Sequence, residues 1–367
     1  MIKSVYIHIP FCKKICSYCD FCKNFYNEKV VINYLKALEK EISNNYKKEV
    51  LDTLYIGGGT PSSLSINDLK RLFKILNQIK LSKNYEFTFE CNYDDISEEL
   101  LMLLNHNRVN RLSIGVQTFN EKYEKILNRK IDKEEMINSI NLSKKYFDNI
   151  NIDLMYALPK ESIKDLENDL KTFIKLDVKH ISTYALIIEE HTKLELDNIE
   201  ELDEDIQNEM YYKIANKLKN NGYIHYELSN FSKPGYESKH NLTYWKNEEY
   251  YGFGAGASGF INGVRYDNTK SVINYINGKT RVYEEKISFD QMIKDEVMLS
   301  LRKIDGINID MFYGKYKVKF SDAFNYNKMI DEKLLSIKDN NIYIPFDKLF
   351  ISNEIIIRLL DSYILND

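Results

Sequence analysis

Four of the chain's five cysteines fall between residues 12 and 22, in the sequence HIPFCKKICSYCDFC. Cys12, Cys16 and Cys19 form a CxxxCxxC pattern, and Cys22 follows three residues later. Three thiolates on one short loop can hold three corners of a cubane [4Fe-4S] cluster and leave the fourth iron open. Soft thiolates also select zinc, and counting Cys22 gives four ligands of the kind found in structural zinc sites. The cysteines therefore predict a metal centre, with an iron–sulfur cluster favoured over zinc.

A glycine-rich turn, GGGTP at residues 57–61, is the second distinctive feature. Glycines at such a turn let backbone groups approach a ligand that a side chain would block. A glycine-rich turn alone more often marks a tight connection between a strand and a helix. Together with the cysteine cluster it indicates a ligand bound beside the metal centre.

Short apolar or alternating runs recur along the chain and are separated by segments of helical period. The runs predicted as strands are residues 5–9, 53–56, 86–90, 111–115, 149–154 and 180–185. Repeated strand–helix alternation predicts an α/β fold with a parallel sheet and right-handed crossovers. The distinctive residues follow the C-terminal ends of several strands, which favours a barrel rim over a doubly wound sheet. We predict an open, TIM-like partial barrel of six βα units.

The alternation stops near residue 285. Residues 204–220 are predicted to be helical, and an aromatic, glycine-rich region follows at residues 223–268. The last segment contains DEVMLSLRKIDG and a short IYIP strand, which predict a small α+β domain of the winged-helix kind. We therefore expect a barrel with its extension over residues 1–285 and a C-terminal domain over residues 286–367.

The motifs YIHIPFC, CxxxCxxC and GGGTP resemble those of radical-SAM enzymes of the oxygen-independent coproporphyrinogen III oxidase superfamily, and the resemblance extends along nearly the whole chain. It implies that Cys12, Cys16 and Cys19 bind a [4Fe-4S] cluster whose open iron is chelated by S-adenosylmethionine (SAM). In that superfamily, reduction cleaves SAM to a 5'-deoxyadenosyl radical. The resemblance further implies SAM contacts from Tyr6, Tyr18, Gly58, Gly59, Thr60, Glu90, Gln117, Arg129, Asp153 and Ala185.

Two of these positions also make chemical sense without the resemblance. Glu90 ends the third predicted strand, where its carboxylate can accept hydrogen bonds from ribose hydroxyls or an amino group. Arg129 can form a two-point contact with a carboxylate. The alternative is a solvated strand end for Glu90 and an ordinary surface cation for Arg129. Their placement on one predicted rim favours the binding role.

Within the superfamily, three features favour a heme chaperone of the HemW type over the oxidase. The oxidase carries CxxxCxxCxC, whereas CDFC places Cys22 three positions after Cys19. The oxidase also has a substantial extension ahead of its cluster, whereas Cys12 comes almost at once here. The third feature is HNLTYW at residues 240–245, which matches the HNxxYW signature associated with heme binding in the HemW type.

The resemblance implies heme contacts from His240, Asn241, Tyr244 and Trp245. A neutral imidazole of His240 could ligate heme iron, and the two aromatic rings could pack against the macrocycle. The alternative is an ordinary loop with a hydrogen-bonded histidine and two packed aromatics.

The segment GFGAGASGF at residues 252–260 has a glycine spacing like that of a dinucleotide-binding loop. It lacks a clear preceding strand, a following helix and an acidic residue about twenty positions on. We expect no dinucleotide there. Many HemW-type sequences read closer to GFGPGAHSF, so Ser258 stands where a histidine is common.

Composition limits the partners. The 51 Lys and Arg residues against 55 Asp and Glu residues give a net charge of −4, which does not argue for nucleic acid. No stretch approaches the roughly 18 apolar residues that span a bilayer, although transient membrane contact stays open. We predict a cytoplasmic protein that transfers heme to an unidentified acceptor. The alternative is an oxygen-independent coproporphyrinogen III oxidase that decarboxylates propionates. Whether SAM is cleaved or only held is not decided by these motifs.

Overall fold

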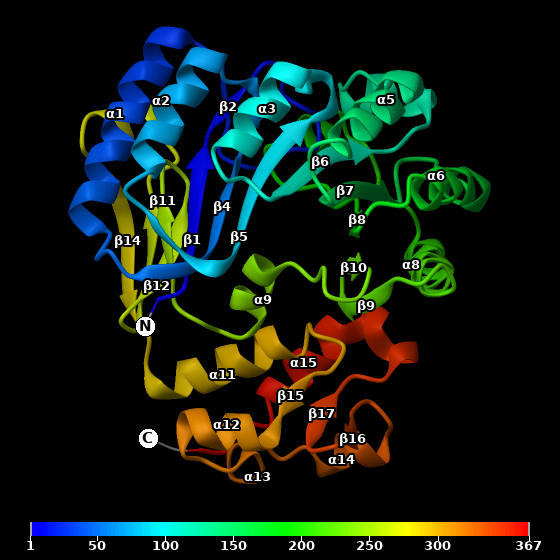
Figure 1. The fold of residues 1–367 in the computed structure, drawn as a ribbon. Coiled ribbons are helices and arrows are strands. Elements are labelled where there is room, and N and C mark those ends of the chain that lie inside the picture. The colour runs from blue at the N-terminus through cyan, green and yellow to red at the C-terminus, as the bar shows by residue number, and fades with distance from the viewer. Residues whose placement is uncertain (1, 366–367) are drawn as a thin grey trace.

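The computed structural model describes residues 2–365. Its centre is a parallel sheet in which each of the six predicted strands is found and each is followed by a helix (Figure 1). The six strands are β1 (Ser4–Ile9), β4 (Val50–Gly58), β5 (Lys80–Asn92), β6 (Arg111–Gln117), β7 (Asn149–Tyr156) and β8 (His180–Ala185). The helices after them are α1 (Glu28–Asn45), α2 (Ile66–Leu76), α3 (Glu98–His106), α5 (Lys133–Ser143), α6 (Ile163–Lys175) and α8 (Glu204–Lys219). The predicted barrel of six βα units is therefore confirmed.

Each helix packs on the sheet through one apolar face. Leu35, Leu38 and Ile42 of α1 are buried, as their spacing predicts, because residues three and four apart share a face. Helix α6 begins with a capping box in which Ser162 and Asp165 each bond the other's backbone N–H. Shorter elements connect these units: β2 (Phe11–Cys12), β3 (Asn24–Phe25), η1 (Pro61–Ser63), η2 (Tyr93–Asp95), η3 (Glu121–Tyr123), α4 (Glu124–Leu127) and α7 (Lys193–Leu196).

The sheet continues beyond the predicted strands at both edges, in the order β14-β13-β12-β11-β1-β4-β5-β6-β7-β8-β10-β9. The added elements are β9 (Ile224–Glu227), β10 (Asn230–Ser232), α9 (Lys239–Trp245), β11 (Tyr250–Phe253), β12 (Ser258–Ile261), β13 (Val264–Asn268), α10 (Val272–Ile276) and β14 (Arg281–Lys286). Strand β11 runs parallel to β1 as a seventh parallel strand.

This extension corrects one expectation about GFGAGASGF. A strand, β11, does lead into the segment, although the sequence shows no clear one. The element that follows is strand β12 and not a helix, so the helix N-terminus that a dinucleotide site needs is missing from this turn.

The C-terminal part forms a separate small sheet with helices around it. Its elements are α11 (Phe289–Ser300), β15 (Ile307–Asn308), α12 (Ile309–Tyr316), α13 (Phe320–Ala323), α14 (Asn327–Asp331), β16 (Ser336–Lys338), β17 (Asn341–Tyr343), η4 (Phe346–Ile351) and α15 (Ser352–Leu360). Strand β17 pairs antiparallel with both β15 and β16, and helices α11 and α14 precede β15 and β16, as in a winged helix. The boundary proposed between residues 285 and 286 falls at the last residue of β14, which ends the large sheet at Lys286.

Candidate functional site

The cysteine loop is closed at its base by β2 and β3, which pair in parallel just beyond β1. The backbone N–H of Asn24 donates to the carbonyl of Pro10 at 2.7 Å, and the N–H of Tyr26 donates to the carbonyl of Cys12 at 2.9 Å. These bonds bring both ends of the loop to the C-terminal end of β1. Cys12, the first cysteine of the motif, therefore has a fixed backbone and is buried.

The rest of the loop rests on the segment after α4. The N–H of Ser17 donates to the carbonyl of Leu127 at 3.1 Å, and Asn128 Nδ2 donates to the carbonyl of Ile15 at 2.9 Å. Asn128 has a left-handed backbone, which turns the chain so that Arg129 faces the loop. Arg129 Nη1 lies 3.8 Å from Cys16 Sγ. The guanidinium of Arg129 therefore faces the cysteine loop.

Cys12, Cys16 and Cys19 form one electrostatic group, whereas Cys22 lies in a different setting. Burial, together with the neighbouring Cys19 and Cys16, raises the pKa of Cys12 to about 11. The Sγ of Cys22 instead donates to the carbonyl of Lys270 at 3.1 Å, and its Cβ would lie 2.4 Å from a Cβ added to Gly256. The structure thus brings together the three cysteines of the motif, and Cys22 packs against the segment that follows β11.

The GGGTP turn lies directly against Cys12. A Cβ on Gly59 would meet Cys12 Sγ at 2.9 Å, and Thr60 Oγ1 donates to the same sulfur at 3.5 Å. Gly58 has a φ of 129°, and a Cβ there would come within 2.8 Å of the backbone nitrogen of Ile9. A side chain at either glycine would fill the space beside the first cysteine. The structure shows that these glycines allow the turn to lie close to Cys12 and to the backbone of β1, and approach of the turn to a ligand stays a prediction.

Glu90 lies beneath this turn and accepts two hydrogen bonds. The Tyr55 hydroxyl donates to Oε1 at 2.7 Å, and the N–H of Gly58 donates to Oε2 at 3.1 Å. Burial raises the pKa of Glu90 to about 7. Burial likewise raises the pKa of Asp153 on β7 to about 6, although Asn151 Nδ2 donates to its Oδ1 at 2.8 Å. Two carboxyl groups with raised pKa values therefore lie on β5 and β7, the two strands that flank β6.

Arg129 is linked to the rim by Asn92, which our sequence analysis missed. The Nη2 of Arg129 donates to Asn92 Oδ1 at 3.1 Å and to the carbonyl of Gly115 at 2.6 Å. Asn92 Nδ2 donates in turn to Thr60 Oγ1 at 3.5 Å. Asn92 ends β5 two residues after Glu90. A polar residue at the end of a predicted strand is the sequence feature that could have identified it. Arg129 Nε is buried without a hydrogen-bond partner, as expected of a cation that awaits an anionic ligand.

The remaining predicted SAM residues occupy the same rim. Gln117 ends β6 with a φ of 71°, and its Nε2 would lie 3.4 Å from a Cβ on Gly115. Tyr18 lies in the cysteine loop, and burial together with Cys16 raises its pKa above the ordinary value. Ala185 ends β8 opposite Tyr156.

Taken together, these residues fit a cluster with SAM beside it: three neighbouring cysteines, a turn without side chains, and an unpartnered arginine nitrogen. Between residues 2 and 365, no group of three His, Cys, Asp or Glu side chains is arranged to hold a single metal ion.

Tyr6 connects the rim to the interior of the sheet. Its hydroxyl lies 2.9 Å from His8 Nδ1, and His8 Nε2 lies 2.8 Å from the carbonyl of Cys22. Because a carbonyl only accepts, His8 carries its proton on Nε2 and Nδ1 accepts from Tyr6. Burial lowers the pKa of His8 to about 4, which keeps this neutral form. Neither our motif analysis nor the family resemblance had singled out His8.

HNLTYW forms helix α9 and not the loop that was the alternative interpretation. His240 is buried, its Nδ1 lies 2.8 Å from Thr53 Oγ1, and its Nε2 lies 2.9 Å from the Tyr244 hydroxyl. Burial, together with the positive charge of Arg111, lowers the pKa of His240 to about 3. The imidazole is therefore neutral, as ligation of iron requires, but both ring nitrogens already have partners.

Tyr244 and the cysteine loop line one cavity of about 300 Å³. Its lining includes Tyr6, His8, Phe21, Cys22 and Tyr244. Phe21 is 65% exposed, so an apolar ring stands at the opening. His240 contributes through Tyr244, which is the member of HNLTYW that reaches this cavity.

The other two predicted heme residues lie elsewhere on α9. The side chain of Asn241 is half-buried and its backbone N–H is capped by Ser238 Oγ at 3.3 Å. Trp245 lies against the C-terminal part, with its ring centroid 5.9 Å from the guanidinium carbon of Arg302.

The pattern of the Radical SAM superfamily matches residues 6–173. The chain is 40% identical to the heme chaperone HemW of Lactococcus lactis, over 99% of this chain and 98% of that protein. It is 39% identical to the heme chaperone HemW of Bacillus subtilis, over 96% of this chain and 98% of that protein. The chain belongs to the HemW family.

Membership of the HemW family confirms the resemblance predicted from YIHIPFC, GGGTP and HNLTYW. The solved structure of coproporphyrinogen III oxidase (HemN) from Escherichia coli matches with a TM-score of 0.86 over 98% of this chain and 90% of that chain. Because the two sequences are 22% identical, this match shows a shared radical-SAM fold and carries no conclusion about activity.

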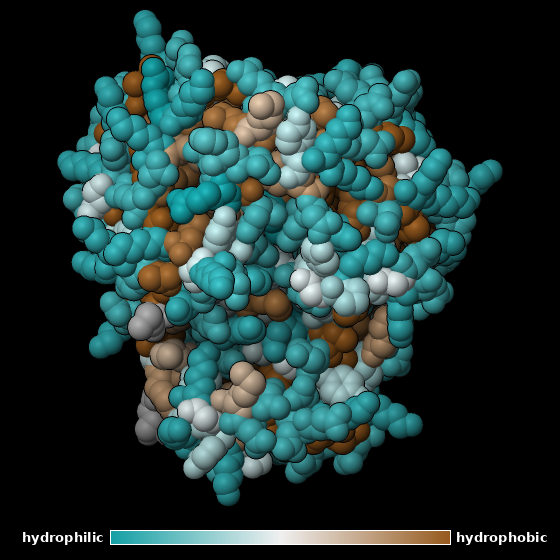
Figure 2. Space-filling view, viewed as in Figure 1, coloured by the Kyte–Doolittle hydropathy of each residue, from teal (hydrophilic) through white to brown (hydrophobic). Residues whose placement is uncertain are grey.

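The surface gives one further observation. The face in Figure 2 is largely hydrophilic, with hydrophobic residues scattered between polar ones. No helix within residues 2–365 is long and apolar enough to cross a membrane.

Proposed function

We propose that this chain is a heme chaperone that binds a [4Fe-4S] cluster, SAM and heme and transfers the heme to an acceptor protein. Full-length identity of 40% to a HemW protein named as a heme chaperone is the observation that carries this proposal. The site adds a physical argument: the helix formed by HNLTYW and the cysteine loop line the same cavity.

Cys12, Cys16 and Cys19 would hold the cluster, with Gly59 leaving room beside the first sulfur. Arg129, with its unpartnered Nε, would pair with the methionyl carboxylate of SAM. Glu90 and Asp153 would accept hydrogen bonds from its amino group and ribose hydroxyls. When bound and reduced, such a cluster would supply an electron for cleavage of SAM.

Tyr244 and Phe21 would contact heme at the cavity, since aromatic rings pack well on a flat macrocycle. His240 could ligate iron only after its Nε2 leaves the Tyr244 hydroxyl or its Nδ1 leaves Thr53. Heme binding is therefore expected to rearrange the His240–Tyr244 pair. We place the protein in the cytoplasm because a reducing compartment keeps a cysteine cluster available as metal ligands.

The second candidate is oxygen-independent coproporphyrinogen III oxidase. The observation in its favour is the shared fold with HemN at a TM-score of 0.86. Decarboxylation of coproporphyrinogen under anaerobic conditions would establish it.

The test is an anaerobic heme titration of the reconstituted protein, followed by the Soret band. We expect saturable, stoichiometric binding by the wild type, a weaker or spectrally altered complex for His240→Ala, and a spectrally altered complex for Tyr244→Phe, which frees His240 Nε2. The milder Tyr244→Phe keeps the ring, so it answers the question even where loss of the buried His240 unfolds the protein. His191→Ala, at an exposed histidine, is the matched control.

A wild type without saturable binding would refute the chaperone, and the coproporphyrinogen assay would follow. Saturable binding that neither variant changes would place heme away from α9.

A further inference from the structure

Helix α9 is held at its first turn by a carboxylate from the barrel. Glu86 on β5 accepts from the backbone N–H of Lys239 through Oε2 at 3.0 Å and from that of His240 through Oε1 at 3.0 Å. Glu86 is 5% exposed, so this contact is shielded from water. A negative charge at a helix N-terminus stabilises the helix because it satisfies free N–H groups and opposes the macrodipole.

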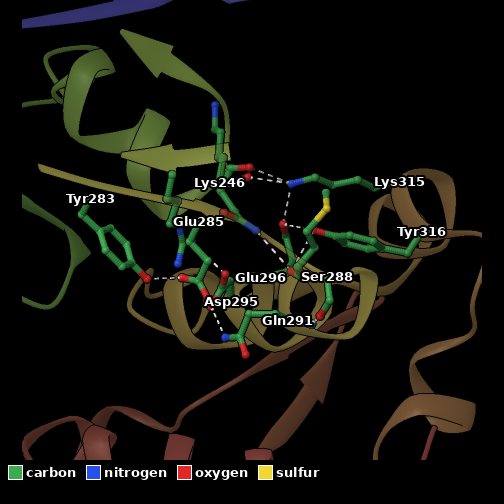
Figure 3. A network of polar contacts seen from close by, with 12 residues as sticks. Lys246, Tyr283, Glu285, Ser288, Gln291, Asp295, Glu296, Lys315 and Tyr316 are labelled. Carbon is green, nitrogen blue, oxygen red and sulfur yellow. Dashed lines mark hydrogen bonds and ion pairs between the residues drawn. The ribbon is translucent and has the colours of Figure 1, made fainter. Parts of the chain in front are cut away.

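The other end of α9 is held by a cation from the C-terminal part. Lys315 on α12 donates through Nζ to the carbonyls of Lys246 and Asn247 at 3.0 and 3.1 Å (Figure 3). The same ammonium pairs with Glu296 on α11 at 2.5 Å. Glu296 also accepts from the Tyr316 hydroxyl at 2.9 Å, which orients the carboxylate toward the lysine.

Additional contacts join the same two parts. Ser300 Oγ on α11 donates to the carbonyl of Trp245 at 3.1 Å, and Asn247 Nδ2 donates to the carbonyl of Met292 at 3.3 Å. Arg302 stands over the Trp245 ring. The C-terminal end of α9 thus has carbonyls that accept from side chains of α11 and α12, and α11 lies next to it in Figure 1.

We propose that Lys315 is a positioning residue for the heme site, through which the C-terminal part sets the position of α9 and of Tyr244 in the cavity. The inference rests on the proposed function where it concerns heme. It gives the C-terminal part a role, which is to hold in place the helix that HNLTYW forms.

The energetic reason is the shortness of α9. A helix of seven residues is not stable alone in water, because nucleation costs more than so few hydrogen bonds return. Opposite charges at its two ends, Glu86 and Lys315, match the direction of its dipole. Without the Lys315 ammonium, the carbonyls of Lys246 and Asn247 and the carboxylate of Glu296 lose the donor that they share. The C-terminal end of α9 is then free to shift.

Trp245 is the chain's single tryptophan and therefore a direct probe of this contact. The test compares the reconstituted wild type with Lys315→Met, Lys315→Arg and Lys328→Met. Lys328 is the control because it lies in the same C-terminal part, is 79% exposed and pairs only weakly with Glu332, at 3.9 Å. Acrylamide quenching of Trp245 fluorescence reports the helix end, and the Soret titration reports heme affinity.

We expect Lys315→Met to increase the quenching of Trp245 and to weaken heme binding about tenfold, as loss of one charged hydrogen-bond donor predicts. Cluster absorption should be unchanged, Lys315→Arg should restore part of the affinity, and Lys328→Met should match the wild type.

Unchanged quenching in Lys315→Met would overturn the anchoring of α9. Changed quenching with wild-type heme affinity would overturn the link to heme. A wild type that binds no heme would refute the proposed function itself, while the quenching comparison would still decide whether Lys315 anchors the helix.

Discussion

The Tyr55 hydroxyl and the Glu90 carboxylate are joined by a 2.7 Å hydrogen bond between the neighbouring strands β4 and β5. The bond stabilises a carboxyl group whose burial raises its pKa to about 7. The N–H of Gly58 gives the same carboxylate its second donor. The glycine turn beside Cys12 and the acid beneath it therefore form one connected unit.

Glu90→Gln tests this unit through pH. The folded-state pKa of Glu90 lies above the value of 4.5 expected for the unfolded chain, so between these values the folded protein binds more protons. Wild-type stability from this group is thus fully present below about pH 4.5 and is lost as pH rises toward 7. Relative to the wild type, Glu90→Gln should gain up to about 3 kcal/mol in free energy of unfolding between pH 5 and 7.5.

Urea unfolding of the cluster-free, reduced protein at several pH values measures this difference. Replacing the carboxylate by an amide also changes the hydrogen bonds that residue 90 accepts. This change adds a contribution to the difference in unfolding free energy that does not depend on pH. A difference between the two proteins that stays constant with pH would show that Glu90 is ionised throughout.

Cys22→Ser should keep the visible absorption and iron content of the reconstituted cluster, whereas Cys16→Ser should lose both. The reason is that Cys22 Sγ donates to the carbonyl of Lys270 at 3.1 Å, while Cys16 lies beside Arg129 in the loop. Visible spectra and iron analysis after anaerobic reconstitution measure the outcome. A folded Cys22→Ser protein without iron would make Cys22 a ligand.

Gly58→Ala should destabilise the protein by more than about 3 kcal/mol, since a Cβ there meets the Ile9 backbone at 2.8 Å and a backbone must move. Gly235→Ala is the matched control: its φ of 83° is also left-handed, but nothing lies within 4 Å. It should cost about 1 kcal/mol. Denaturant unfolding of both proteins gives the comparison, and equal losses would show that the turn is not tightly packed against β1.

Arg129→Lys should weaken SAM binding by about tenfold or more while the cluster is retained, because lysine keeps the charge but loses the two-point fork. The Nη2 of Arg129 is already held by Asn92 and Gly115, so its orientation is set before a ligand arrives. Anaerobic equilibrium dialysis with SAM measures affinity, and Arg71→Lys on α2 serves as the control. Equal SAM affinity in Arg129→Lys and Arg71→Lys would show that Arg129 does not contribute to SAM binding.

Local patterns in the sequence determined the parallel core and the cysteine loop. Strands β1 and β4–β8 were predictable because alternation and apolar runs reflect burial of the residues themselves. The three cysteines were predictable because their ligand spacing lies within eight residues, so no long-range contact is needed to bring them together.

The tertiary structure decided the edges of the sheet and the supports of the site. Strand β14, with six exposed residues, has no apolar alternation to reveal it, and it exists because β13 supplies its hydrogen bonds. Asn92 and Tyr55 belong to none of the sequence motifs, and the position of His8 within YIHIPFC does not reveal its hydrogen bonds to Tyr6 and Cys22. Helix α9 depends on Glu86, 153 residues from Lys239, and on Lys315, 69 residues from Lys246. Such partners are separated along the chain, so only the folding of the whole molecule brings them within hydrogen-bond distance.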